Sequence, residues 1–204
     1  MSRAILDIKD LIDFKNMNLD NKENNYYDIL SALHKSIRGS DVNSSLHYLA
    51  RLLILNDLKI ICRRLLVIAY EDIGLSNPNM AVKTKIACDT ALELGMPEAR
   101  IVLSNIVIEL AISPKSNTAY LAINEALKDV EEIGDLPIPK HILNRYIDDN
   151  EYVYKYPHDY KNSIVKQNYS PEKIKNKKYY KPKEESMYEK NLKDRYMLIE
   201  KEIK

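Results

Sequence analysis

The pattern of residues 31–53 predicts two amphipathic helices separated by a tight turn. We predict that Gly39 takes the left-handed conformation that ends the first helix at low steric cost, and that Ser40 or Asp41 caps the second. Apolar residues at three-and-four spacing let the two helices pack as a hairpin. These residues are Leu30, Leu33 and Ile37 in the first helix and Val42, Leu46, Leu49, Ala50 and Leu53 in the second.

The same pattern of helix starts and stops recurs as far as residue 135 and favours an all-α fold. The further helices are predicted to begin at Asp57, Pro78, Pro97 and Ser116 and to end at or before Gly74, Gly95, Ser113 and Gly134. The last helix carries an apolar stripe of Tyr120, Ile123, Leu127 and Val130. Because the connections are short, we expect residues 25–135 to form a compact bundle of antiparallel helices.

From Leu136 onward the composition changes to a Tyr/Pro/Lys-rich arm. Residues 136–204 hold five of the prolines and ten of the fifteen tyrosines. Such a stretch cannot build its own core, but tyrosine rings can lie on a bundle surface while their hydroxyl groups stay hydrated. We therefore expect an irregular arm that wraps the bundle. A terminal helix is predicted from Ser186, with Tyr188, Leu192, Tyr196 and Ile199 on one face.

Bulk composition excludes several classes of protein. The net charge is only +1, and the two cysteines lie in apolar helical patterns, so we expect reduced core thiols. The four histidines have no metal-ligand spacing and no catalytic neighbours. We predict no catalytic, cofactor-binding or metal-ligating residue, and we expect a soluble, cytoplasmic chain because neither a signal peptide nor a membrane span is evident.

Three tyrosines, Tyr169, Tyr179 and Tyr180, are interleaved with lysines in residues 161–183, which hold eight lysines and one acidic residue. Lysines neutralise phosphates and aromatic rings stack on unpaired bases, so the segment suits single-stranded DNA. The alternative is a solvated basic arm whose tyrosines serve packing. The candidate contacts are Lys161, Lys166, Lys173, Lys175, Lys177, Lys178, Tyr179 and Tyr180.

Two other groups of polar residues are candidates for sites. Lys115, Ser116 and Asn117 stand at a predicted helix N-terminus, which can bind a phosphate or can simply be capped by Ser116. Charged residues in the apolar helices either form structural ion pairs or project into a subunit interface. This second group comprises Lys35, Arg38, Arg51, Arg63, Arg64, Glu71 and Asp72.

Four colinear segments resemble the C-terminal region of the RarA/MgsA family of AAA+ ATPases, which includes the Werner-helicase-interacting proteins. They are residues 35–41 with 48–51, residues 71–75 with Pro78, residues 113–117 with 119–120, and residues 154–160. The resemblance covers roughly residues 24–185. Residues 1–16 resemble the end of the family's helical lid, so residues 1–24 would be lid and linker. Residues 140–150 depart from the family pattern, and no family role is carried over to them.

The resemblance implies a clamp-loader-like collar in which residues 25–135 hold a homotetramer together. The parent protein would be a DNA-dependent ATPase in replication, repair and recombination, associated with the nucleoid. Its implied partners are single-stranded or forked DNA, a single-strand DNA-binding protein and a replicative helicase.

The four glycines have no P-loop spacing and no acidic magnesium site follows a strand, so we expect this chain not to hydrolyse ATP. ATP and magnesium would bind a core missing from it. The chain would then be a C-terminal fragment or a shortened natural product. We expect an assembly module; the alternatives are a single-stranded DNA-binding module that uses the basic arm and a docking module for a partner protein.

Overall fold

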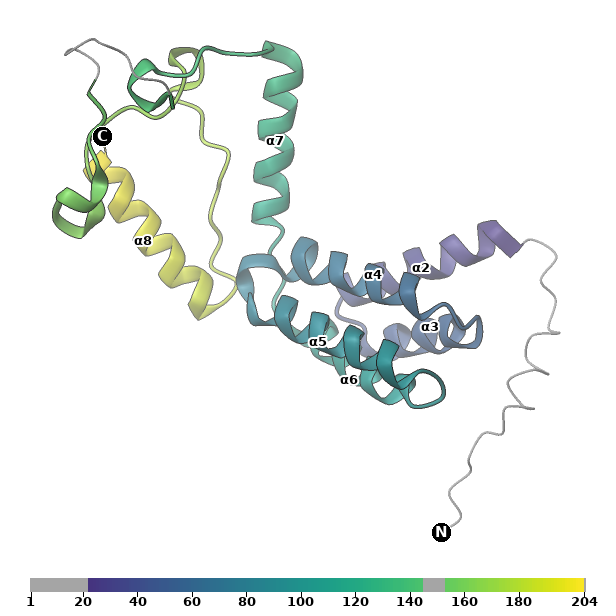
Figure 1. Ribbon diagram of the computed structural model, residues 1–204. Helices are drawn as coiled ribbons and strands as arrows, with labels where there is room; N and C mark the ends of the chain where they lie inside the picture. Colours follow the sequence, from purple (N-terminus) through teal and green to yellow (C-terminus); the bar gives the residue numbers. More distant parts are fainter. Residues whose placement is uncertain (1–21, 145–152, 204) are drawn as a thin grey trace. The chain divides into compact units, whose positions relative to one another are not determined.

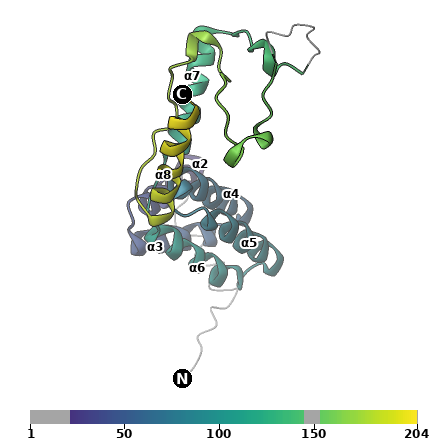
Figure 2. The same ribbon diagram turned by 90° about the vertical axis from the view of Figure 1, so that its left-hand side faces the viewer.

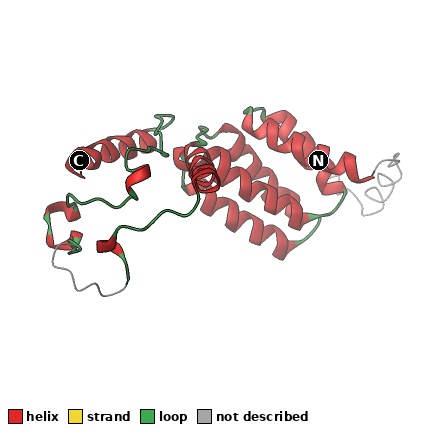
Figure 3. Ribbon diagram, turned by 90° about the horizontal axis from the view of Figure 1, so that it is seen from above, coloured by secondary structure: helices red, strands yellow, loops and turns green. Residues whose placement is uncertain are grey.

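The computed structural model describes residues 22–144 and 153–203, and these residues form helices, turns and extended segments without any strand (Figure 3). The predicted all-α class is confirmed. The chain divides into two compact units, one up to Asn117 and one from Thr118, and each is described here by itself. The predicted lid segment, residues 1–16, lies outside the described residues.

The described part of unit 1, residues 22–117, is a packed set of α-helices (Figure 1). They are α2 (Lys22–Arg38), α3 (Val42–Ile54), α4 (Leu58–Ile68), α5 (Asn79–Leu94) and α6 (Ala99–Ile112). Helix α2 packs on α3, α4 and α6, while α5 packs on α4 and α6. The core contains Leu33, Ile37, Leu52, Ile61, Leu65 and Leu103, and the thiols of Cys62 and Cys88 are buried and unbonded to each other.

Helix α3 begins as the sequence pattern predicts. At the end of α2, the left-handed residue lies one position later than predicted. Asp41 caps α3 by accepting a hydrogen bond from the Ser44 amide at 2.9 Å. The left-handed residue is Ser40, with φ 60°, and not Gly39 as predicted. The Asp41 amide bonds to the carbonyl of Ser36, which makes Ser40 the C′ residue of a Schellman motif.

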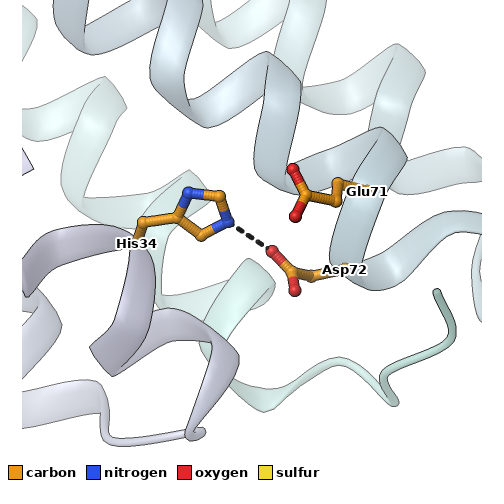
Figure 4. Close-up of side chains that lie close together, drawn as sticks. All are labelled: His34, Glu71 and Asp72. Atoms are coloured by element: carbon orange, nitrogen blue, oxygen red, sulfur yellow. Dashed lines mark hydrogen bonds and ion pairs between the residues drawn. The ribbon is translucent and has the colours of Figure 1, made fainter. Parts of the chain in front are cut away.

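Helix α4 does not run regularly to Ile73 as its pattern predicts. It ends at Ile68 and continues as a π-helical turn, η1 (Ala69–Ile73), followed by a 3-10 turn, η2 (Gly74–Ser76). The wider π turn includes one extra residue. The chain thereby presents both Glu71 and Asp72 near the C-terminal end of α2 (Figure 4).

Unit 2 contains α7 (Thr118–Ile133), the arm and α8 (Met187–Ile203). The predicted terminal helix is present, and Ser186 caps it by accepting from the Glu189 amide at 3.1 Å. Short 3-10 turns interrupt the arm, which turns back at η4 and η5 (Figure 2). These turns are η3 (Lys140–Ile142), η4 (Pro157–Asp159), η5 (Lys161–Ser163) and η6 (Glu172–Ile174). Helix α7 thus groups with the arm, whereas the sequence pattern predicts it as part of the bundle.

Among the described helices, none combines the length and the apolar character that crossing a membrane requires.

We predict that Gly74→Ala destabilises unit 1 more than Gly95→Ala does. Both glycines have positive φ, so either alanine costs roughly 1–3 kcal/mol of backbone strain. At Gly74 the new Cβ would also lie 2.6 Å from the carbonyl oxygen of Ser116, whereas at Gly95 it would meet no atom within 4 Å. Urea unfolding of both variants measures the difference. Equal losses of unfolding free energy would contradict the close approach at Gly74.

Candidate functional site

A buried ionic cluster joins α2 to the π turn in unit 1 (Figure 4). His34 Nε2 lies 2.6 Å from Asp72 Oδ2, and Arg38 Nε donates to Asp72 Oδ1 at 2.5 Å. The guanidinium also donates to Glu71 Oε1 at 2.9 Å. Asp72 is only 5% exposed and His34 only 7%. A buried carboxylate is tolerated there because both of its oxygens have partners.

His34 contacts groups on both sides of its ring. Its Nε2 donates to Asp72, because a carboxylate can only accept, and Arg38 Nη2 lies 3.0 Å from the same nitrogen. Arg64 Nη1 lies 3.5 Å from the Nδ1 atom. His34 therefore links the carboxylate on one side to a second guanidinium on the other.

The protonation of Asp72 reflects two opposing effects. Burial raises its pKa, but hydrogen bonds and charge from His34 and Arg38 outweigh that effect, so the pKa lies below the ordinary value. The carboxylate thus stays ionised at neutral pH. It contributes stability that is present above the pKa of the unfolded chain and is lost as the pH falls through the folded value.

His34, Glu71 and Asp72 could each offer one atom to a metal ion, because these atoms lie within 4.8 Å of one another. Arg38, however, already donates to both carboxylates. Its fixed positive charge satisfies the acidic groups and would repel a cation. The geometry therefore favours a structural ion-pair network, which is one of the two roles predicted for Arg38, Glu71 and Asp72.

The segment 113–117 binds to the same part of unit 1. The Ser116 amide donates to the carbonyl of Asp72 at 2.7 Å, and Ser76 Oγ lies 2.6 Å from the Pro114 carbonyl. Three of the four segments that carry the family resemblance, residues 35–41, 71–75 and 113–117, thus converge. They hold together the end of α2, the π turn and the chain that leads to α7.

Lys115 directs its ammonium group into unit 1. It donates to the carbonyls of Ala111 at 2.8 Å and Ser113 at 2.6 Å, and to Ser40 Oγ at 3.1 Å. Burial lowers its pKa, against the opposing effect of the negative charge on Asp72. All three N–H donors have intramolecular acceptors, so the contacts favour a structural role; the anion site predicted at Lys115, Ser116 and Asn117 stays a prediction.

The basic segment of unit 2 is largely occupied by internal contacts. We call residues 177–181 the strap, an extended stretch that runs between α7 and α8 (Figure 1). Alternate side chains point to opposite helices, as extended backbone requires. On the side of α7, both Lys177 and Tyr179 contact Asp129, and Lys181 contacts Glu125. On the side of α8, Lys178 contacts Glu200 and Tyr180 contacts Tyr196.

Asp129 is the centre of these contacts. Lys177 Nζ and Tyr179 Oη both donate to it at 2.9 Å. The hydrogen bond from Lys177 is the main cause that holds the pKa of Asp129 below its usual value, although burial opposes it. The lysines and tyrosines of the strap, which suggested DNA binding, thus make internal contacts in unit 2. Lys161, Lys166 and Lys173 remain exposed and have no ion-pair partner within the described part of the chain.

The other candidate residues are dispersed over unit 1. Arg63 and Lys35 are exposed, and Arg51 lies over the ring of Tyr48 with its guanidinium carbon 5.9 Å from the ring centre. His34 was missed by sequence reasoning. Its position one turn before Arg38, on the same helix face, was the available signal.

Within unit 2, helix α7 has an apolar face that the described residues leave exposed. Tyr120, Ile123, Leu127 and Val130 are between 42% and 64% exposed. The opposite face carries Glu125 and Asp129, which contact the strap. A second uncovered apolar face on α6 holds Ile101, Ile108 and Ile112.

We predict that Asp72→Asn lowers the free energy of unfolding by about 2–3 kcal/mol at pH 7, less than for a fully buried pair because Arg38 is 47% exposed. Below about pH 3.9 the difference from the unmodified chain should shrink, because Asp72 takes up a proton first in the unfolded chain and then, at lower pH, in the folded chain. Urea unfolding at several pH values measures this. Glu71→Gln is the control and should cost less, since Glu71 has one partner and is less buried. A pH-independent difference for Asp72→Asn would contradict the assigned charge.

Comparison of the sequence with those of known proteins identifies the family of this chain. The sequence model of the family described as MgsA AAA+ ATPase C terminal matches residues 39–200. Replication-associated recombination protein A of Bacillus subtilis is 52% identical over 194 residues, which are 89% of this chain and 44% of that protein. The protein of the same name from Escherichia coli K12 is 35% identical over 170 residues, 80% of this chain and 38% of that protein.

A eukaryotic protein shows the same partial coverage. ATPase WRNIP1 of Dictyostelium discoideum is 35% identical over 163 residues, 76% of this chain and 18% of that protein. The chain thus spans less than half the length of each of these three relatives. It belongs to the RarA/MgsA family of AAA+ ATPases and corresponds to their C-terminal domain.

Proposed function

We propose that this domain holds copies of its parent ATPase together. The observation that carries the proposal is the orientation of α7. A helix on the surface of a globular protein normally turns its apolar stripe inward and its charged face to water. Helix α7 does the reverse, because Glu125 and Asp129 contact the strap while the four-residue apolar stripe is exposed.

An exposed stripe of large apolar side chains favours association with another surface. The partner that we propose is a second copy of this chain. The apolar face on α6 offers a second surface for association. Closed tetramers of twofold symmetry need more than one kind of self-complementary contact, so two separate faces suit a homotetramer.

Within this proposal the chain supplies assembly and the missing part of the protein supplies chemistry. ATP and magnesium would bind that part, and the assembled protein would act on single-stranded or forked DNA during replication, repair and recombination, in the cytoplasm and at the nucleoid. A single-strand DNA-binding protein or a replicative helicase would be its partner there. The names of the relatives, replication-associated recombination protein A among them, support this setting.

The alternative of a DNA-binding arm receives less support from the contacts. Lys175, Lys177, Lys178 and Lys181 each form an ion pair with an acidic residue of unit 2. Phosphate groups would have to displace those carboxylates, and the counterions released per lysine would be fewer. Lys161, Lys166 and Lys173 are the lysines on which a DNA-binding arm would have to rely.

We predict that Ile123→Glu, and separately Leu127→Glu, lowers the mass of the oligomer to that of a smaller species, because burying one unpaired carboxylate in an apolar contact costs several kcal/mol. Light scattering at micromolar concentration measures the mass. Leu121→Glu is the matched control, since Leu121 is 51% exposed on α7 but lies off the stripe. Circular dichroism checks that helicity is kept. A monomeric unmodified chain, or an oligomer whose mass neither stripe substitution changes, would overturn the proposal.

A further inference from the structure

The exposed stripe of α7 has a spacing that reads the same in both directions. Tyr120, Ile123, Leu127 and Val130 are separated by three, four and three residues. Two such helices laid antiparallel about a twofold axis at residue 125 therefore bring unlike positions together: Tyr120 meets Val130 of the second copy, and Ile123 meets Leu127 of the second copy. Building on the proposed function, we propose that α7 pairs antiparallel with α7 of a second copy through this stripe.

The two edges of the stripe differ in size and polarity. With 3.6 residues per turn, Ala119 and Ala126 border one edge, and Asn124 and Glu131 border the other. The small side chains of the first edge let two helix backbones approach closely. On the second edge the two copies of Asn124 lie near the twofold axis, where each side-chain amide can donate to the carbonyl oxygen of the other. The two copies of Glu131 lie about 18 Å apart along the pair, beyond the Debye length of about 8 Å at physiological salt, so their repulsion is largely screened.

A groove at the C-terminal end of α7 provides a place for the largest side chain of the stripe. Its volume is about 210 Å³, and its walls are mostly apolar, from Val130, Ile133, Leu136, Pro171 and Ile174. Val130 belongs both to the groove and to the stripe. Tyr120 and Val130 lie about 15 Å apart along one helix, so the antiparallel pairing carries each Tyr120 ring to the groove of the other copy.

The groove also depends on the strap. Tyr179 lines it, and the same side chain donates to Asp129 of α7. The internal contacts of the basic segment therefore shape the surface that receives the second copy. The strap would then have a role in assembly that does not require its lysines to bind the phosphates of DNA.

Disulfide formation between single-cysteine variants tests the pairing. Ile123→Cys and Leu127→Cys chains are prepared separately, mixed, and treated with a mild azodicarboxamide oxidant, which takes up the two hydrogen atoms lost when two thiols join. We expect a covalent dimer of twice the 23.7 kDa chain mass in the mixture and little in either variant alone. The native thiols of Cys62 and Cys88 are buried, and the unmodified chain serves as the control for them.

Two further mixtures sharpen the result. Ile123→Cys mixed with Leu121→Cys should give no covalent dimer, because Leu121 is exposed but lies about 140° around the helix from the centre of the stripe. Tyr120→Ala should weaken the association measured by light scattering, whereas Tyr188→Ala, an exposed tyrosine of α8, should leave it unchanged.

The outcomes separate this inference from the proposed function. A covalent dimer in either cysteine variant alone would show a parallel or different pairing and would overturn the inference. A chain that associates by light scattering without any disulfide in the mixture would overturn the antiparallel pairing and leave the assembly role standing. A chain that stays monomeric would overturn both.

Discussion

The Asp72 residue holds unit 1 together through two different groups. Its side chain binds His34 and Arg38 of α2, and its backbone carbonyl accepts from Ser116, just before α7 begins. A carboxylate this deeply buried is stable only while both oxygens have charged or protonated partners. The contact between α2 and the π turn therefore depends on one ionised group, and the chain leading to α7 is bonded to the backbone of the same residue. The close approach of Gly74 to Ser116 brings the same two segments together.

Local sequence rules predicted much of the helical structure and failed where tertiary contacts decide. Asp41 and Asp57 cap α3 and α4 as their residue types predict. The left-handed residue fell on Ser40 because the Schellman hydrogen bonds, not the presence of glycine alone, set the end of α2. The π turn was not predicted, since apolar periodicity through Ile73 fits a regular helix equally well. Its carboxylates make contacts that involve a helix more than thirty residues earlier in the chain.

The candidate sites show the limit of composition as a guide. Eight lysines within residues 161–183 suggest a free cationic surface, but the acidic residues that neutralise several of them lie far away in the sequence, on α7 and α8. The run Lys-Lys-Tyr-Tyr-Lys at residues 177–181 was visible in the sequence. Its meaning was not, because it required knowing that an extended segment passes between two helices. In the same way, the stripe on α7 was predicted correctly as a pattern, while the direction in which it faces came only from the structure.

The π turn also fixes the length of the chain at this point. Removing one residue between Ala69 and Ile73 would restore an ordinary α-helical register and even improve its hydrogen-bond geometry. The same deletion would place the consecutive residues of the turn about 100° apart, as in an ordinary α-helix, and Glu71 and Asp72 would no longer both face Arg38. The deletion would thus favour the isolated helix but leave the buried carboxylate of Asp72 without its partner. Insertions and deletions that a surface loop absorbs easily are forbidden here by electrostatics.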